Sequence, residues 1–266
     1  MVRPPVAAGT FYESDPAQLR EWLGSALADA RARGPAAAAR TDPKALIVPH
    51  AGYVYSGAVA AAGYSAVSAA GWQRIRRVVL LGPSHFVPVA GLAVSPADAF
   101  GTPLGAVPVN RQARSAVCKL TSCEATDRPH ALEHSLEVQV PFLQAAADRF
   151  TLVPIAVGQA RPRDVAEALA LLWGGPETLI VISTDLSHYL GYQAAGIRDR
   201  RTARAILALD PSAIGDADAC GARPLRGALL AAARNGLRAS LLDLRNSGDS
   251  DGDRDRVVGY GAFALG

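Results

Sequence analysis

Cysteine is scarce in this chain of 266 residues, which contains only three. A small, odd number in a long chain cannot supply the paired framework of a disulfide-rich secreted domain, so we expect reduced thiols. Cys118 and Cys123 fall on an expected helix and turn, where a cysteine usually serves as a small packing residue. Cys220, which precedes Gly221 in an expected loop, is open to either packing or metal binding.

Long apolar runs and concentrations of charge are lacking as well. Nowhere are 18 consecutive residues apolar, and the segment from Met1 to Pro5 lacks the apolar core of a signal peptide. Lysine and arginine number 27 against 24 aspartates and glutamates, and no stretch of sequence gathers the small excess. We therefore expect a cytoplasmic protein that binds neither nucleic acid nor membranes.

What the chain has in quantity is apolar sequence, since half of its residues are hydrophobic. Strand-like runs alternate with helical patterns to the C-terminus, which predicts one three-layer αβα domain over residues 1–266 around a largely parallel or mixed sheet. Strands are expected from residue 45 and over 77–82, 91–95, 152–157, 178–182, 237–244 and 257–264. Helices are expected over 16–31, from about 57 to 70, and over 111–120, 163–173, 194–209 and 224–235, with a turn or hairpin at 99–105.

Three of the expected strands lead directly to a histidine. Their apolar runs are short, rich in β-branched residues and unalternated, as is typical of parallel strands buried on both faces. The residues that follow them are His50, His85 and His188, the last of which is preceded by Asp185. Ligands of open α/β sheets gather outside the carboxyl ends of the strands, so we expect these histidines to share one site.

Only two further histidines occur, His130 and His134. On a helix they would share a face with Glu137, although Pro141 makes the extent of such a helix uncertain. A site with two histidine ligands needs a third protein ligand and open positions. The candidates for that third ligand are Asp185, His188, Glu137 and Cys220.

Six ordered segments of the chain resemble the Memo family, known in bacteria and archaea as AmmeMemoRadiSam system protein B. They span residues 3–12 (RPPVAAGTFY), 48–53 (VPHAGY), 81–85 (LGPSH), 133–142 (EHSLEVQVPF), 183–189 (STDLSHY) and 219–221 (ACG). The family in turn is similar in fold to class III extradiol dioxygenases, which are non-haem iron(II) enzymes. The resemblance therefore implies the same αβα architecture for this chain.

The resemblance also implies roles for individual residues. It makes His50, His85 and Cys220 the metal ligands, and gives His188 the place of the acid/base histidine of the dioxygenases, with Asp185 and His134 around it. The dioxygenases complete their ligand set with a carboxylate, whereas here a cysteine stands at that position. A thiolate is a softer ligand that favours copper(I), zinc or iron in a reducing site, and it is itself open to oxidation.

Three functions are consistent with these observations. The first is a redox enzyme with one transition-metal ion, Fe(II) before Cu or Zn, that acts on a small molecule between the walls formed by Phe11, Tyr12, Tyr53 and Tyr55. The second is a copper- or iron-binding protein without turnover, which presents its pocket to a peptide or to a radical-SAM-associated partner. The third is a zinc hydrolase.

Overall fold

A computed structural model describes residues 1–33, 42–250 and 253–266 of the protein. The strands are β1 (Val2–Arg3), β2 (Ala45–Val48), β3 (Arg77–Pro83), β4 (Leu92–Val94), β5 (Ala99–Thr102), β6 (Gly105–Pro108), β7 (Cys123–Ala125), β8 (Thr151–Val157), β9 (Thr178–Ser183), β10 (His188–Leu190), β11 (Ala239–Asn246) and β12 (Val257–Leu265). The α-helices are α1 (Pro16–Arg33), α2 (Tyr53–Ser65), α3 (Ala69–Arg74), α4 (Arg111–Val117), α5 (Val140–Ala146), α6 (Pro162–Leu172), α7 (Tyr192–Leu207) and α8 (Ala222–Arg234). The described residues also form the short 3-10 helices η2 (Glu137–Gln139), η3 (Pro211–Ala213) and η4 (Ser247–Asp249).

The central sheet has the strand order β10-β12-β2-β9-β3-β8-β4-β7, with β11 paired to β12. Its middle strands β2, β9, β3 and β8 run parallel to one another, whereas β12 and β4 join them antiparallel. The sheet is therefore mixed, with a parallel centre, as the sequence predicts. The central strands are buried along almost their whole length, which explains why their apolar runs do not alternate.

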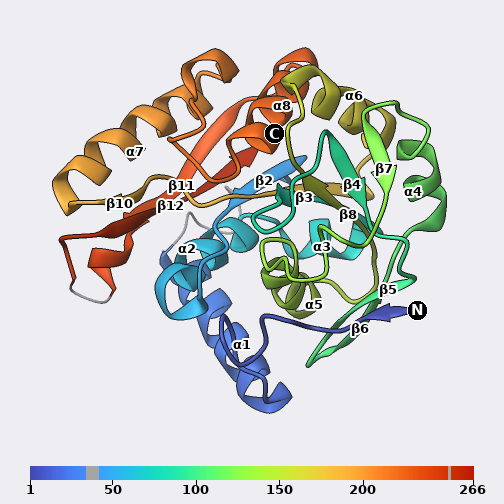
Figure 1. The fold of residues 1–266 in the computed structure, drawn as a ribbon. Coiled ribbons are helices and arrows are strands. Elements are labelled where there is room, and N and C mark those ends of the chain that lie inside the picture. The colour runs from blue at the N-terminus through green and yellow to red at the C-terminus, as the bar shows by residue number, and fades with distance from the viewer. Residues whose placement is uncertain (34–41, 251–252) are drawn as a thin grey trace.

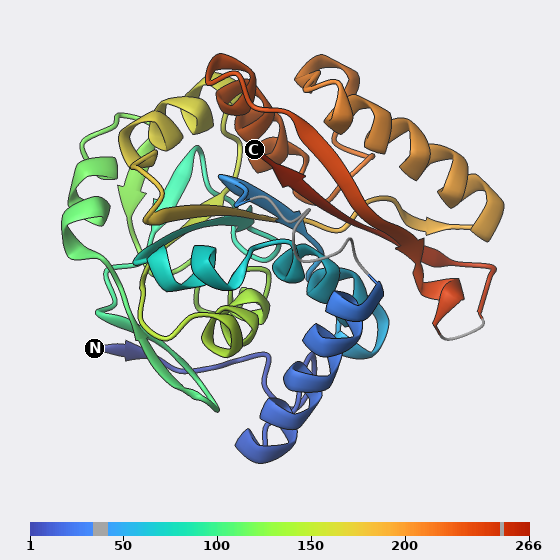
Figure 2. The same ribbon diagram turned by 180° about the vertical axis from the view of Figure 1, so that it is seen from behind.

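Helices cover both faces of this sheet, as Figures 1 and 2 show from opposite sides. One core lies between the sheet and α1, α2, α3 and α5, and a second lies between the sheet and α4, α6, α7 and α8. Successive strand residues enter opposite cores: Leu46 packs in the first and Ile47 in the second. The three-layer αβα arrangement expected from the sequence is confirmed. No helix in the described ranges is both long and apolar enough to cross a bilayer.

Most expected elements form within a few residues of their predicted bounds. Helix α1 begins where Asp15 caps it, since the Asp15 carboxylate accepts the N–H groups of Ala17 and Gln18. The helix expected to reach residue 70 divides into α2 and α3, because Ser68 caps a new helix by accepting the N–H of Gly71 at 2.9 Å. The hairpin expected at 99–105 is formed by β5 and β6.

The helical interpretation of residues 130–137 is wrong. His130 lies in a turn and His134 in irregular backbone before a second turn. Helical structure starts only at η2 and continues into α5, where Pro141 occupies the first turn. A turn allows neighbouring side chains to diverge, so His134 and Glu137 do not share a face. This difference decides which residues reach the candidate site.

The N-terminal segment is tied to the same turn region by a buried ion pair. The Arg3 guanidinium donates to the Glu137 carboxylate at 2.9 Å, and the side chains are 2% and 1% exposed. Arg3 also donates to the carbonyl oxygens of His130 and Glu133. The remaining capacity of Glu137 is taken by the N–H groups of residues 6 and 7 and by the hydroxyl of Tyr12. Such a satisfied pair fixes the position of the segment.

The close approach of α1 to α2 yields a test of the packing. A Cβ added at Gly57 of α2 would overlap the Trp22 ring of α1, whereas one added at Gly24 of α1 meets no atom within 4 Å. We expect Gly57→Ala to destabilise the protein by about 1–3 kcal/mol through overpacking. The control Gly24→Ala should stabilise it by about 0.5–1 kcal/mol through helix propensity. Urea unfolding measures both, and equal effects of the two substitutions would contradict this packing.

Candidate metal centre

The carboxyl ends of three neighbouring strands place the candidate site. Strand β9 pairs in parallel with both β2 and β3, so all three end at the same edge of the sheet. His50 follows β2 by two residues, His85 follows β3 by two, and Asp185 follows β9 by two. Side chains that are far apart in sequence therefore enter one region of the molecule.

Three histidines have ligand atoms that all lie within 4.8 Å of one another: His50, His85 and His134. The His85 and His134 rings stack at 5.0 Å between centroids and 15° between planes, and the His50 ring meets both nearly edge-on. Two members of the group follow strand ends, and the third, His134, lies in the irregular segment that leads to η2. This geometry is compatible with binding a metal ion.

The hydrogen bonds of Ser183 determine which nitrogen of His50 is free. The Ser183 hydroxyl donates to the Ser135 carbonyl at 2.6 Å and accepts the side-chain amide of Gln139 at 2.8 Å. Its only proton is thus committed, so its 2.9 Å contact with His50 requires His50 Nδ1–H to be the donor. The lone pair of His50 is then on Nε2, which faces the site.

Glu133 holds the other two histidines, and the sequence analysis did not assign it a role. It is 1% exposed, and its Oε1 lies 2.9 Å from His85 Nδ1 and 3.5 Å from His134 Nδ1. Its carboxylate also accepts the backbone N–H groups of His85 and Ser135. A carboxylate behind a ligating imidazole fixes the ring and its tautomer. The position of Glu133 directly before His134 in the sequence was the signal available for this role.

Burial keeps the imidazoles of His50 and His134 uncharged. It lowers the pKa of His50 to about 3, assisted by the neighbouring His85, and it lowers the pKa of His134 to about 4. Burial acts in the opposite direction on Glu133, but hydrogen bonds from His85 and the charge of His85 outweigh it and bring the pKa of Glu133 down to about 2. At neutral pH the ionised Glu133 carboxylate thus lies beside the neutral imidazoles of His50 and His134.

Cys220 lies beside this group, although it is not one of the three residues in mutual reach. Its Sγ is 3.3 Å from His50 Nε2 and accepts the backbone N–H of Asp185 at 3.3 Å. Burial raises the pKa of the Cys220 thiol, and the nearby Asp185 adds to the effect. The loop before α8 therefore delivers the sulfur to the face of His50 that carries the free lone pair.

Asp185 lies in the loop after β9, and His188 begins β10. Asp185 is 4% exposed, and its Oδ1 accepts the N–H groups of His50 at 2.8 Å and of Ala51 at 3.3 Å. Burial raises the pKa of its carboxyl group. His188 is half-buried and its Nδ1 lies 2.8 Å from the Leu186 carbonyl, which accepts Nδ1–H and leaves Nε2 as the basic nitrogen. A charge on His188 acts on both His50 and Asp185, so it borders the site.

Two other candidates lie outside the site. His130 is buried near Phe100, with Nε2 3.1 Å from the Ala93 carbonyl. Glu137 is occupied by Arg3 and the N-terminal segment, as described above. Neither belongs to the three-histidine group.

Aromatic rings flank the histidines, though only one of the four expected wall residues does so directly. The Phe11 ring lies 4.2 Å from the His134 ring. The ring of Phe86, which directly follows His85, lies 6.0 Å from the His134 ring. Phe86 is 56% exposed, so an apolar side chain stands at the entrance. Tyr12 and Tyr53 are buried and donate their hydroxyl protons to protein acceptors.

Fold and site together define a mixed α/β protein with a histidine cluster suited to a metal ion. The profile of the family described as Memo-like protein matches residues 3–264. MEMO1 family proteins of Sulfolobus acidocaldarius and Thermotoga maritima are each 36% identical to this chain, and each alignment covers 98% of both sequences. The chain belongs to the Memo family.

A solved structure of an uncharacterized protein, JW3007 from Escherichia coli K12, is similar in fold. Its TM-score is 0.53 at 12% sequence identity, and the match covers 83% of this chain and 98% of that one. At this identity the likeness concerns the fold alone. The family assignment and the helix-covered mixed sheet agree with the Memo and dioxygenase-like architecture that the sequence resemblance implied.

The shared carboxylate yields a test of how the site is held. We expect Glu133→Gln to weaken metal binding by about 10- to 100-fold, because the amide NH2 cannot accept a hydrogen bond and would face either the backbone N–H of His85 or the two imidazoles. Titration of the chelator-treated protein with a divalent metal measures the loss. Glu124→Gln changes an exposed acid in β7 and is the control. Unchanged affinity in both variants would contradict the positioning role of Glu133.

The lowered pKa values predict how stability depends on pH in the metal-free protein. His50, His130 and His134 bind protons more readily when unfolded, so the free energy of unfolding should fall as the pH drops from about 6.5 towards 4. Each histidine contributes up to about 1.4 kcal/mol per pH unit. The raised pKa values of Asp185 and Asp199 oppose the effect and reduce the net slope. Urea unfolding at several pH values measures it, and a stability that rises on acidification would be the contrary result.

Proposed function

We propose that the protein binds one transition-metal ion, Fe(II) before copper or zinc, and uses it in redox chemistry on a small molecule. The observation that carries this proposal is the mutual proximity of the ligand atoms of His50, His85 and His134. Imidazole suits iron, copper and zinc, and a few protein ligands leave positions free for exchangeable molecules. A bound metal of this kind would polarise a substrate oxygen and exchange electrons with it.

The donor set supports a metal rather than a purely structural cluster. The imidazoles of His50 and His134 are uncharged at neutral pH, so they gain little from contact with each other, whereas each has a lone pair to give to a metal ion. Ser183 and Glu133 hold Nδ1 of His50 and of His85, which leaves Nε2 of each for the ion. The rings need no reorganisation of tautomer in order to bind, because their partners have already selected it.

Cys220 is our proposed third ligand, with His50 and His85. Donors bound to one ion at about 2.1 and 2.3 Å lie roughly 3.5 Å apart, and the distance from Sγ to His50 Nε2 is 3.3 Å. The buried thiol must lose its proton in order to bind, so metal uptake should release a proton. His134 is the competing third ligand, and mutation decides between the two.

His188, Asp185 and His134 would then act on the substrate side. His188 has its Nδ1–H engaged by the Leu186 carbonyl, so Nε2 is available to accept a proton from a substrate hydroxyl. Asp185 holds the backbone of His50 and offers a negative charge to His188. Phe11, whose ring lies 4.2 Å from that of His134, would form an apolar wall for the substrate. These assignments suit an acid/base role around the metal.

The thiol beside His50 also favours a second candidate, a copper-binding protein without turnover. Sulfur and imidazole together suit Cu(I), which would bind tightly and leave no need for a substrate. In that case the apolar entrance at Phe86 would receive a peptide or a partner of a radical-SAM-associated system. Zinc held by the same ligands, with hydrolytic activity, is the weaker alternative.

One preparation separates these functions. The protein is purified without oxygen, its metal is identified by elemental analysis, and oxygen uptake is followed with a panel of catechols. We expect one equivalent of iron and substrate-dependent oxygen consumption. Tightly held copper without oxygen consumption would favour the copper-binding protein over the enzyme. Zinc together with esterase or amidase activity would favour the hydrolase.

Three substitutions test the residue roles. Cys220→Ser should weaken metal binding at least tenfold, because a hydroxyl is a poorer donor than a thiolate. His188→Ala should leave binding within about twofold and lower only reactivity. His134→Ala is the decisive comparison: a loss of binding larger than that of Cys220→Ser would make His134 the third ligand. Metal titration with circular dichroism as a check of folding provides the measurement.

A further inference from the structure

A large cavity lies at the opposite edge of the sheet from the histidines. Its volume is about 970 Å³, within the usual size of small-molecule pockets. It is bounded by α1, by β6, and by the connections that lead into β3 and β8. Since β3 begins at this cavity and ends next to His85, about seven residues or roughly 20 Å of strand separate the two places.

Four arginines line this cavity against a single acid. They are Arg20 and Arg31 of α1, Arg76 before β3, and Arg149 before β8, and the acid is Asp148. All four are exposed at the surface of the cavity. The excess of three positive charges equals the formal net charge of the whole chain, +3. Folding thus concentrates at one place a charge that the sequence distributes over 130 residues.

Three of these guanidinium groups have no carboxylate partner within the part of the chain that the structure describes. Arg20 donates to the Pro16 carbonyl at 3.4 Å, and Arg76 donates to the Ile75 carbonyl at 2.8 Å. Arg149 has neither an ion pair nor a side-chain hydrogen bond among the described residues. Their remaining N–H donors are open to an anion.

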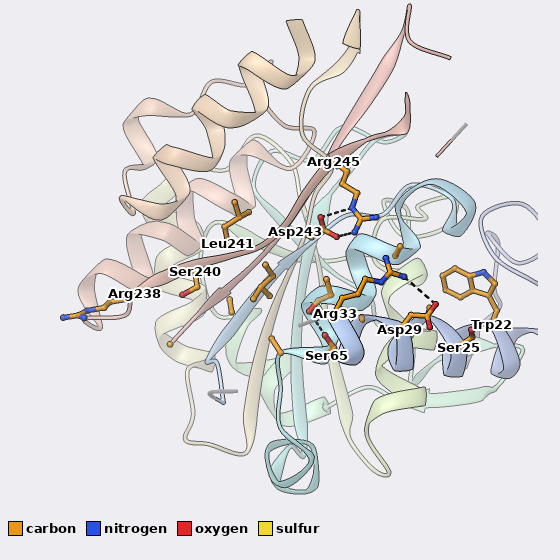
Figure 3. A pocket seen from close by; sticks show the side chains of 18 residues that line it. Trp22, Ser25, Asp29, Arg33, Ser65, Arg238, Ser240, Leu241, Asp243 and Arg245 are labelled. Carbon is orange, nitrogen blue, oxygen red and sulfur yellow. Dashed lines mark hydrogen bonds and ion pairs between the residues drawn. The ribbon is translucent and has the colours of Figure 1, made fainter. Parts of the chain in front are cut away.

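The other large groove of the protein has a different charge pattern. It lies between α1, α2 and β11, has a volume of about 880 Å³, and contains Arg33, Arg238 and Arg245. Figure 3 shows Arg33 directed at Asp29 and Arg245 at Asp243, with distances of 3.6 and 2.7 Å. Two of its three arginines are therefore neutralised inside the groove. The arginines without a carboxylate partner, Arg20, Arg76 and Arg149, therefore distinguish the cavity beside β6 from the other groove beside α1.

We propose that the four-arginine cavity binds a soluble small molecule bearing phosphoryl groups with at least two negative charges. Guanidinium groups recognise phosphate through paired N–H donors, and several of them around one hollow discriminate in favour of multiply charged anions. The cavity is large enough for a molecule of nucleotide size, while Arg20, Arg76 and Arg149 converge from three separate segments. This site is independent of the metal centre and of the function proposed for it.

Pyrophosphate is the probe for this site, titrated calorimetrically into the intact protein at low ionic strength. We expect binding that weakens as salt is added, because the contacts are between exposed charges. The combined variant Arg20→Gln, Arg76→Gln and Arg149→Gln should bind at least tenfold more weakly. Arg238→Gln, an exposed arginine of the other groove, should bind as the parent does. Metal binding should be the same in all of these proteins.

The following outcomes count against the proposal. It is overturned by absence of pyrophosphate binding up to about 5 mM in the parent protein, or by equal binding in the parent and the combined variant. Vesicles containing anionic lipid form a second arm: binding to vesicles without binding of pyrophosphate would replace a soluble ligand by a membrane surface. If the combined variant unfolds, the single variant Arg149→Gln, which removes an exposed side chain, must still bind severalfold more weakly.

Discussion

The parallel pairing of β9 with β2 and β3 is the constraint on which the candidate site depends. Val48 lies opposite Ser183, and Leu81 lies opposite Ile182, so the three strands leave the sheet at nearly the same level. This level brings the N–H of His50 to the carboxylate of Asp185. A shift of register by one residue would exchange the two faces of a strand and send its apolar side chains into the wrong core. The two cores therefore fix the geometry of the histidines.

A second requirement is that buried polar groups be satisfied. The site places imidazoles, a carboxylate, a thiol and a hydroxyl in a region where an unpaired polar atom is costly. Ser183 serves His50, Ser135 and Gln139 at once, and Glu133 serves two imidazoles and two backbone amides. Since these partners hold the rings from behind, the nitrogens that remain free are those that face a common point. The site is thus rigid because each of its buried polar groups is held by hydrogen bonds to several neighbours.

Strands with uniform hydrophobicity were the part of the fold that the sequence predicted best. Their burial on both faces explains this success, because a short, continuous apolar run is typical of a buried parallel strand. The positions of His50 and His85 after β2 and β3 could then be predicted from the ends of these runs. The place of His134 could not be predicted in the same way. A spacing of four residues between His130 and His134 suggested a helix, but the segment is held in turns by Arg3, which is more than 120 residues away. The four-arginine cavity could not be predicted from the sequence either, because Arg20 and Arg149 are brought to one cavity only by tertiary packing.

The buried pair of Arg3 and Glu137 has a consequence for the order in which the protein folds. Its partners are separated by 134 positions, so loop-closure entropy makes this contact expensive until the central strands have assembled. The segment around Arg3 is then expected to dock after the central strands have paired, and it brings Phe11 with it to His134. The aromatic wall beside His134 is in this sense completed late, after the strands that lead to His50 and His85 have paired with β9.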